Sequence, residues 1–153
     1  SQLTPLIPGA DAWPRFHRNK SEVFEARSVN VRVEKSHSVL LEGMEGSILP
    51  IAVAHGEGRV VASAESIAAL NANNQVIMRY VDSQGNATEQ YPLNPNGSPE
   101  GISGVTSKDG RATILMPHPE RNFRAIQHSW KPEDWDQDGA WLRMFRNARK
   151  FIG

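Results

Sequence analysis

The pattern of apolar and polar residues along the chain predicts several β-strands. Strict alternation starts at Glu25, and its apolar positions are Ala26, Val29, Val31 and Val33. Such alternation is typical of a half-buried strand. Residues 48–54 form a nearly unbroken apolar run, as expected for a buried strand, and residues 75–82 return to strand character. The first half of the chain therefore predicts three strands.

Two turn motifs predict hairpins further along. Ser83-Gln84-Gly85-Asn86 follows the strand at 75–82, so we expect its partner strand at residues 87–91. Lys108-Asp109-Gly110 separates the apolar stretches 102–106 and 111–116, which predicts a second hairpin. Residues 94–99 consist entirely of turn formers, and they predict a loop with several side-chain hydrogen-bonding groups.

Helical spacing appears in two places. Residues 64–73 contain helix formers, with Ile67 and Leu70 three apart. Near the C-terminus, apolar residues recur at a spacing of three to four, and this predicts an amphipathic helix with the face Trp141, Phe145, Ala148 and Ile152. A short helical turn is expected at Leu40 and Leu41, capped by Ser36 or Ser38.

Residues 1–14 contain three prolines, which predicts a connecting segment that enters a single domain at residues 15–153. The formal net charge is zero, and this argues against binding of nucleic acid. No apolar run approaches the roughly 18 residues of a membrane span, and the first residues lack the order of a signal peptide. We therefore expect a soluble, cytoplasmic protein that contacts neither nucleic acid nor membrane.

The chain contains no cysteine. Disulfides, thiolate metal sites and thiol catalysis by these 153 residues are thereby excluded. The histidines and acids also lack a zinc-ligand spacing such as His-x-x-x-His, so we expect no metal site.

The strongest candidate for chemistry is His118 with Glu120, in the motif Met116-Pro117-His118-Pro119-Glu120-Arg121 at the end of a predicted strand. Pro119 disfavours the helical region for His118, so the segment is expected to stay extended, with residues i and i+2 on one side. The Glu120 carboxylate then reaches the imidazole. This geometry is that of a general base oriented by an acid, two members of a nucleophile-base-acid triad.

A second candidate is His55-Gly56-Glu57-Gly58-Arg59, where the chain leaves the predicted strand at 48–54. Glycines on both sides of Glu57 permit a tight turn and a close approach of backbone to a ligand. The residues alone leave two alternatives open, a binding loop or a simple glycine-rich turn, and the simple turn is the commoner of the two.

Four ordered motifs together resemble one family, phosphoribosylformylglycinamidine synthase, the purine-pathway glutamine amidotransferase. The four are Arg15-Phe16-x-x-Asn19-x-Ser21-x-x-Phe24-Glu25-Ala26-Arg27, His55-Gly56-Glu57-Gly58-Arg59, Asn94-Pro95-Asn96-Gly97-Ser98 and Met116-Pro117-His118-Pro119-Glu120-Arg121. The resemblance extends over nearly the whole chain, and it is to the C-terminal glutaminase domain of the long, single-chain bacterial form.

The resemblance implies an α/β fold, part of a class I, triad-type glutamine amidotransferase domain with a mixed sheet, hairpins and a C-terminal amphipathic helix. It places the triad base on His118 and the acid on Glu120, and, by a weaker match, the glutamine-holding loop on Ala54, His55, Gly56 and Glu57. The family's nucleophilic cysteine belongs to an elbow upstream of Leu6-Ile7-Pro8-Gly9, so the chain is expected to be the downstream part of the domain.

The resemblance also implies partners: glutamine as substrate, and an ATP-dependent synthetase domain of the same polypeptide, which uses ATP and magnesium. This chain itself is expected to need no cofactor, to self-associate and to be inactive alone. Two other hypotheses stay open. One is a non-catalytic packing module, and the other is a metal-assisted hydrolase that uses His55, His118 and Glu120.

Overall fold

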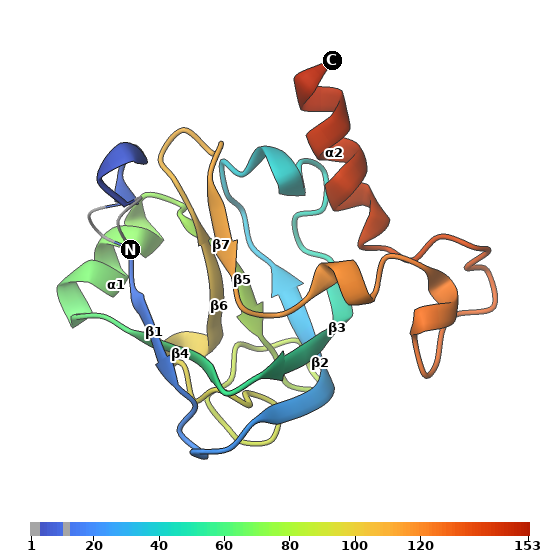
Figure 1. The fold of residues 1–153 in the computed structure, drawn as a ribbon, viewed down its shortest axis with the longest axis horizontal. Helices are drawn as coiled ribbons and strands as arrows, with labels where there is room; N and C mark the ends of the chain where they lie inside the picture. The colour runs from blue at the N-terminus through green and yellow to red at the C-terminus, as the bar shows by residue number, and fades with distance from the viewer. Residues whose placement is uncertain (1–3, 11–12) are drawn as a thin grey trace.

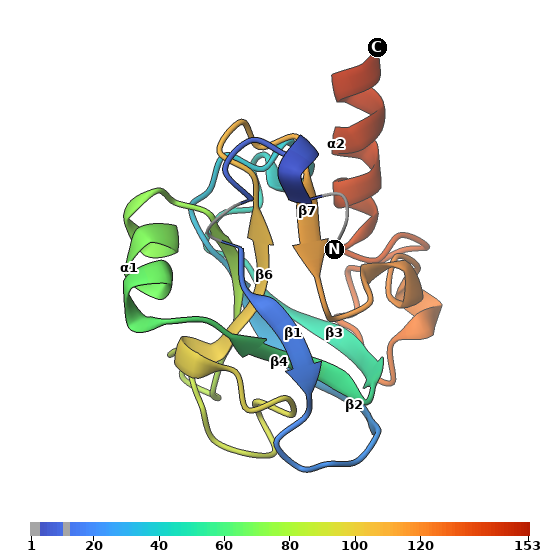
Figure 2. The same cartoon turned by 60° about the vertical axis from the view of Figure 1, so that its left-hand side comes forward.

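The computed structural model describes residues 4–10 and 13–153 and shows two α-helices on opposite sides of a five-stranded sheet (Figure 1). A smaller sheet of two strands lies beside it (Figure 2). The strands are β1 (Arg15–Arg18), β2 (Glu25–Val33), β3 (Ile48–His55), β4 (Glu57–Val61), β5 (Val76–Tyr80), β6 (Ile102–Thr106) and β7 (Thr113–Leu115). The helices are α1 (Ala64–Ala72) and α2 (Leu142–Ile152). None of the described helices is long and apolar enough to cross a membrane.

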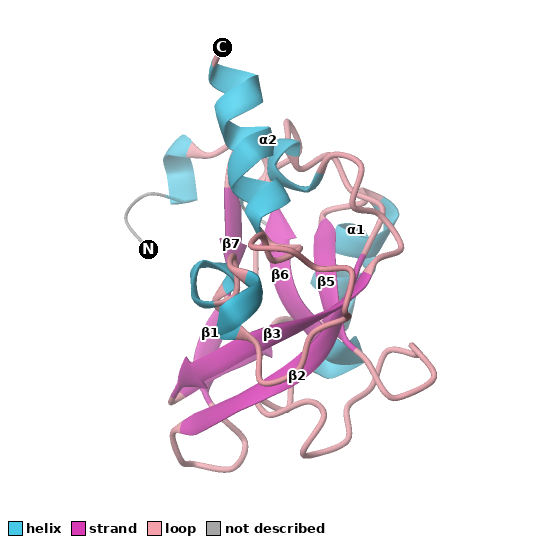
Figure 3. Ribbon diagram, turned by 90° about the vertical axis from the view of Figure 1, so that its right-hand side faces the viewer, coloured by secondary structure: helices cyan, strands magenta, loops and turns pink. Residues whose placement is uncertain are grey.

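The larger sheet has the strand order β3-β2-β5-β6-β7, and the smaller one pairs β1 with β4 (Figure 3). All ladders between these strands are antiparallel, so the expected mixed sheet is wrong for the described residues. A parallel pair needs a long crossover between strands of one sheet, usually a helix. Here α1 joins β4 to β5, and these two strands belong to different sheets.

Most of the predicted strands form, but the expected strand at residues 87–91 does not. That segment makes only an isolated bridge between Val81 and Ala87. The reason is that β5 already has a neighbour on each edge, β2 and β6, which leaves no edge for a third partner. The alternation of β2 also has a different start: Glu25 is buried and Ala26 exposed, because Glu25 lies in phase with Val29, Val31 and Val33. Its Oε2 accepts a 2.5 Å hydrogen bond from Arg27 Nη2.

Two apolar clusters fill the two faces of the sheet. One lies under α2 and includes Val31, Ile51, Tyr80 and Trp141. The other lies under α1, where Ile67 and Leu70 pack with residues of β5 and β6. Each α-helix thus closes one core, and burial of these apolar side chains is the main stabilising term.

The buried face of α2 differs from the predicted one. Trp141 is buried as predicted, but Phe145 and Ile152 are exposed, and Met144 and Asn147 are buried in their place. The helix packs on a short 3₁₀ helix (Val39–Leu41), and Asn147 Nδ2 donates to the carbonyl oxygens of Leu40 and Glu42, both at 2.9 Å. A polar side chain therefore occupies the centre of the contact, and apolar spacing alone could not reveal it.

The predicted turn at Leu40 and Leu41 is this 3₁₀ helix, but Ser38 makes no side-chain cap. Its hydroxyl instead lies 3.0 Å from Thr113 Oγ1 of β7.

Within residues 1–14, Trp13 packs against the core under α1 and donates from Nε1 to Thr106 O at 3.1 Å. The boundary between a connecting segment (1–14) and a domain (15–153) stays a prediction.

Candidate functional site

His118 lies just beyond β7, at a place where the chain crosses to β3. Its backbone N–H donates to Ala52 O at 2.8 Å, and the Asn122 side chain accepts from the Ala52 N–H at 2.6 Å. Both backbone groups of Ala52 are therefore used to hold the segment that contains His118. Asn122 is buried, as expected for a side chain that satisfies a backbone donor inside the fold.

The imidazole of His118 contacts Glu120 as predicted. The Nδ1 to Oε1 distance is 2.8 Å, inside the range of a hydrogen bond. The route differs from the expected extended tripeptide, because Pro119–Arg121 forms a 3₁₀ turn directly after His118. The proline turn, and not the pleat of a strand, brings the two side chains together.

The tautomer of the neutral His118 ring follows from this contact. An ionised carboxylate only accepts hydrogen bonds, so Nδ1 is the nitrogen that bears hydrogen and Nε2 presents a lone pair. Nε2 is buried and has no hydrogen-bond partner in the described residues. The arrangement can take up a proton at Nε2 while Glu120 balances the charge that results.

Glu120 is largely exposed, and its Oε1 also lies 3.9 Å from Arg121 Nε. An exposed ion pair of this kind adds little to stability, so the contact serves mainly to orient the His118 ring.

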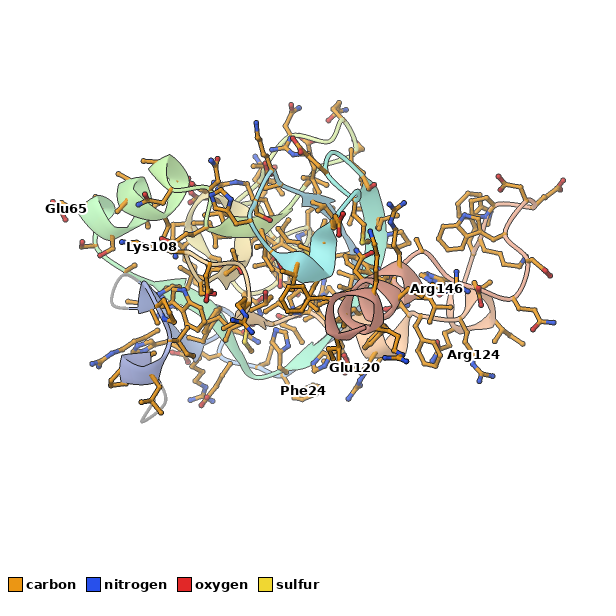
Figure 4. The ribbon with its side chains drawn as sticks, turned by 90° about the horizontal axis from the view of Figure 1, so that it is seen from above. Phe24, Glu65, Lys108, Glu120, Arg124 and Arg146 are labelled. Atoms are coloured by element: carbon orange, nitrogen blue, oxygen red, sulfur yellow. The ribbon has the colours of Figure 1, made fainter. Side chains whose placement is uncertain are left out.

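A separate ion pair lies at α2. Figure 4 looks along this helix and shows Arg146 extending toward the segment before it, where Arg146 Nη2 pairs with Asp138 Oδ2 at 2.5 Å.

The second predicted motif lies next to the first, through His55. The ring centroids of His55 and His118 are 5.7 Å apart, with the planes tilted by 45°. His55 ends β3, and the chain turns at Gly56 to start β4 at Glu57. The structure thus brings together three sequence-predicted side chains, His55, His118 and Glu120.

The other residues of the predicted binding loop, Ala54, Gly56 and Glu57, take part in backbone pairing or hydrogen bonding. Ala54 pairs with Ala26 in the β2–β3 ladder, and Gly56 O accepts from Asn19 N at 2.9 Å. Glu57 is exposed and pairs with Arg18 across the small sheet. Their predicted contact with substrate stays a prediction.

His55 is held in a polar pocket inside the fold. Only 9% of the residue is exposed, and its Nε2 lies 2.9 Å from Asn96 Nδ2. Burial lowers the pKa of His55 below its ordinary value of 6.5, and the neighbouring His118 acts in the same direction. His55 is therefore neutral at neutral pH.

Sequence reasoning missed the buried polar side chains around these histidines: Asn19, Tyr80, Asn96 and Asn122. A signal for Asn96 was present, because the loop at 94–99 is rich in side-chain hydrogen-bonding groups. Such loops usually face solvent, whereas here Asn94, Asn96 and Ser98 are buried. Only the tertiary fold places them beneath His55.

Two hollows elsewhere on the molecule do not include this site. One, of about 320 Å³, lies between residues 43–49 and residues 139–146, which include the start of α2. The other, of about 690 Å³, is lined by residues before and at the start of α2, among them Phe123 and Leu142. Among the described residues, no group of three or more His, Asp or Glu side chains is arranged to hold a metal ion.

Comparisons with known proteins agree on one family. The model of the CobB/CobQ-like glutamine amidotransferase domain matches residues 1–152. Among solved structures, the chain is similar to PurLQS from Thermotoga maritima, with a TM-score of 0.64 and 26% sequence identity. The similarity covers 92% of this chain and 53% of that chain, so the 153 residues span about half the length of the matched protein.

Proposed function

The chain belongs to the family of CobB/CobQ-like glutamine amidotransferase domains, and on this basis we propose that it is part of the glutaminase domain of a phosphoribosylformylglycinamidine synthase. That enzyme hydrolyses glutamine to glutamate and uses the ammonia for the ATP-dependent conversion of formylglycinamide ribonucleotide to formylglycinamidine ribonucleotide. The similarity to PurLQS and the four ordered motifs support this function.

One observation is central to the proposal: His118 Nδ1 lies 2.8 Å from Glu120 Oε1, and the lone pair on His118 Nε2 has no partner in the described residues. In a class I, triad-type glutaminase these two residues are base and acid. The nucleophile is a cysteine thiol, which these 153 residues do not supply. A second segment or chain has to bring it to His118.

The proposed reaction has two stages at His118. Nε2 first takes the thiol proton, and the thiolate sulfur forms a bond to the side-chain carbonyl carbon of glutamine. The carbon–nitrogen bond then breaks, and Nε2–H protonates the leaving nitrogen to give ammonia and a glutamyl thioester. Next, Nε2 takes a proton from water, whose oxygen bonds to the thioester carbon; the carbon–sulfur bond breaks, glutamate is released, and Nε2–H returns the proton to the sulfur to restore the thiol. Proton transfer of this kind is worth typically 10²–10⁴-fold in rate.

The loop of Ala54, His55, Gly56 and Glu57 is proposed to hold the glutamine. The position of His55 beside His118 supports this assignment. The synthetase domain of the same polypeptide is the proposed partner, and ATP and magnesium belong to that domain. On the same grounds we place the protein in the cytoplasm, with residues 15–153 as the glutaminase part and 1–14 as its connection.

The test is glutamine hydrolysis by an amidotransferase that contains this chain together with its cysteine segment. We expect glutamate release, and a fall in its rate of about 10²–10⁴-fold in His118→Ala, because this variant removes the proposed proton shuttle. His37 is exposed and serves as the control: His37→Ala keeps the wild-type rate. Wild-type hydrolysis by the His118→Ala protein contradicts the proposal.

Glu120→Gln separates the role of the acid from that of the base. A neutral amide can still accept from Nδ1 of His118 but cannot balance the charge of the imidazolium. We therefore expect a smaller fall in rate than in His118→Ala. An equal or larger fall means that Glu120 has another role.

The absence of cysteine also favours a second candidate, a non-catalytic module that packs against a synthetase domain. In that case the His118→Ala and Glu120→Gln variants of the larger protein keep glutaminase activity. A metal-assisted hydrolase has no donor set in the described residues, and metal analysis of the purified protein tests it directly.

A further inference from the structure

Three buried polar side chains lie behind His55 and have no part in the proposed reaction. Asn19 follows β1, Tyr80 ends β5, and Asn96 lies in the loop before β6; at most 2% of each is exposed. Burying polar groups is costly unless they are hydrogen-bonded, and these three contact one another. Their contacts determine which atoms donate and which accept.

The order of donors and acceptors starts at Asn19. Its Nδ2 donates to the backbone oxygens of Val23 (3.0 Å) and His55 (2.8 Å). Carbonyl oxygens only accept, so the amide orientation of Asn19 is fixed and its oxygen faces Asn96. The group of Asn96 at this oxygen must therefore be the donor Nδ2, at 2.7 Å.

The same nitrogen of Asn96 faces His55. Nδ2 lies 2.9 Å from His55 Nε2, while Oδ1 of Asn96 accepts from the Tyr80 hydroxyl. His55 Nε2 must then be an acceptor, and a neutral ring with a lone pair on Nε2 has its hydrogen on Nδ1. A charged His55 would place one N–H against another, so the amide selects one tautomer of the neutral ring.

Two ring nitrogens remain without a partner in the described residues, His55 Nδ1 and His118 Nε2. Both are buried. The first is a donor by the argument above, and the second is an acceptor because Glu120 holds the hydrogen of His118 on Nδ1. One unmatched donor and one unmatched acceptor thus lie on rings whose centroids are 5.7 Å apart.

We propose that Asn96, held by Asn19 and Tyr80, is a positioning residue that fixes His55 as the neutral Nδ1–H tautomer, so that an uncharged ring with an unused donor lies beside His118. Tyr80 then donates to Asn96 and Asn96 to His55, while His118 donates to Glu120. A neutral His55 places no positive charge beside His118, so the uptake of a proton at His118 Nε2 is not opposed. The last step rests on the proposed role of His118, whereas the tautomer of His55 does not.

The tautomer is measured first, in long-range proton–nitrogen correlation spectra of the 153-residue chain at mildly alkaline pH. These spectra distinguish ring nitrogens with hydrogen from those without. The signals of His55 are identified by their loss in His55→Gln. We expect hydrogen on Nδ1 and none on Nε2. Hydrogen on Nε2 of His55 in the wild-type chain overturns the inference without any further variant.

Asn96→Asp then tests the cause. The carboxylate has the shape of the amide but only accepts, so the hydrogen of His55 is expected to move to Nε2. Asn94→Asp is the matched control, since Asn94 is buried in the same loop and donates to the backbone oxygens of Thr88 and Ser98, not to a histidine. Hydrogen that stays on Nδ1 in the Asn96→Asp chain overturns the role of Asn96.

The catalytic consequence is measured in the amidotransferase that contains the cysteine segment. Asn96→Asp is expected to lower kcat by about 10- to 100-fold with little change in KM, a smaller loss than removal of the base. His55→Gln can accept from Asn96 and still donate, so it should retain more activity than His55→Leu. If these two variants have equal rates while His118→Ala abolishes hydrolysis, the proposed function stands and this inference fails.

Discussion

His55 is the buried histidine among the five of the chain, all of which lie in the described residues. Its pKa is lowered, first by burial and then by the neighbouring His118. In the unfolded chain the same group returns to its ordinary value of 6.5. Between the two values the unfolded state binds more protons than the folded state, so the free energy of unfolding rises with pH in this window.

We therefore expect the protein to lose stability as the pH falls below about 6.5, the ordinary pKa of histidine. His55→Gln, which cannot take up a proton, should reduce this dependence. Urea unfolding at a series of pH values measures it, and His37→Gln, at an exposed position, is the control. Equal pH dependence in the wild-type and His55→Gln chains would show that His55 is not the titrating group.

The contact between His118 and Glu120 could be foreseen because the two residues are two apart in the sequence. The polar side chains beneath His55 could not, since Asn19, Tyr80 and Asn96 come from three distant segments. Asn122 is similar: its role depends on Ala52, 70 residues away in the chain. Site residues that act through local geometry are thus readable from sequence, and those that act through tertiary contacts are not.

At the scale of elements, the turn between β3 and β4 shows what the two glycines around Glu57 do. A Cβ at Gly58 would lie 2.5 Å from His55 Nε2 and 2.6 Å from Asn96 Nδ2. A Cβ at Gly56 would meet nothing within 4 Å. One of the two alternatives for this motif was a close approach of backbone to a ligand. At Gly58 the close approach is to two side chains of the protein itself.

These two positions form a matched pair for mutation. We expect Gly58→Ala to destabilise the fold by about 1–3 kcal/mol, because His55 and Asn96 are buried and have little room to move. Gly56→Ala should lie within about 0.5 kcal/mol of wild type or be slightly more stable. Thermal and urea unfolding measure both. If the Gly58→Ala protein is as stable as the Gly56→Ala protein, His55 and Asn96 can shift to make room for the added methyl group at little cost in free energy.

The elements that were predicted correctly are those with a strong local pattern. Alternation in β2, the apolar run of β3 and the turn at residues 108–110 each specify a strand or hairpin with little help from the rest of the fold. The errors occur where contacts between distant elements determine the structure. Residues 87–91 find no free strand edge, and the buried face of α2 is set by its contact with the Val39–Leu41 turn. Local sequence contains no information on edges that another strand already occupies.

At the scale of the whole molecule, apolar side chains remain exposed at the end of α2. Phe151 is 52% exposed and Ile152 79%. Phe145 on the same helix is also exposed, as is Ile126 in the segment before it. Phe151 and Ile152 are adjacent in the chain, and adjoining exposed apolar groups commonly mark a surface that another chain covers. This observation supports the proposed self-association of the chain.

We therefore expect the isolated chain to form dimers or larger assemblies as its concentration rises. Sedimentation velocity over a concentration series measures this. The double variant Phe151→Ser/Ile152→Ser should shift the equilibrium toward monomer, since it removes apolar area from the end of α2. Leu6→Ser/Val23→Ser removes comparable exposed side chains, 78% and 56% exposed, outside this helix and is the control. A wild-type chain that stays monomeric at the highest concentration contradicts the prediction. If both double variants dissociate equally, a different surface makes the contact.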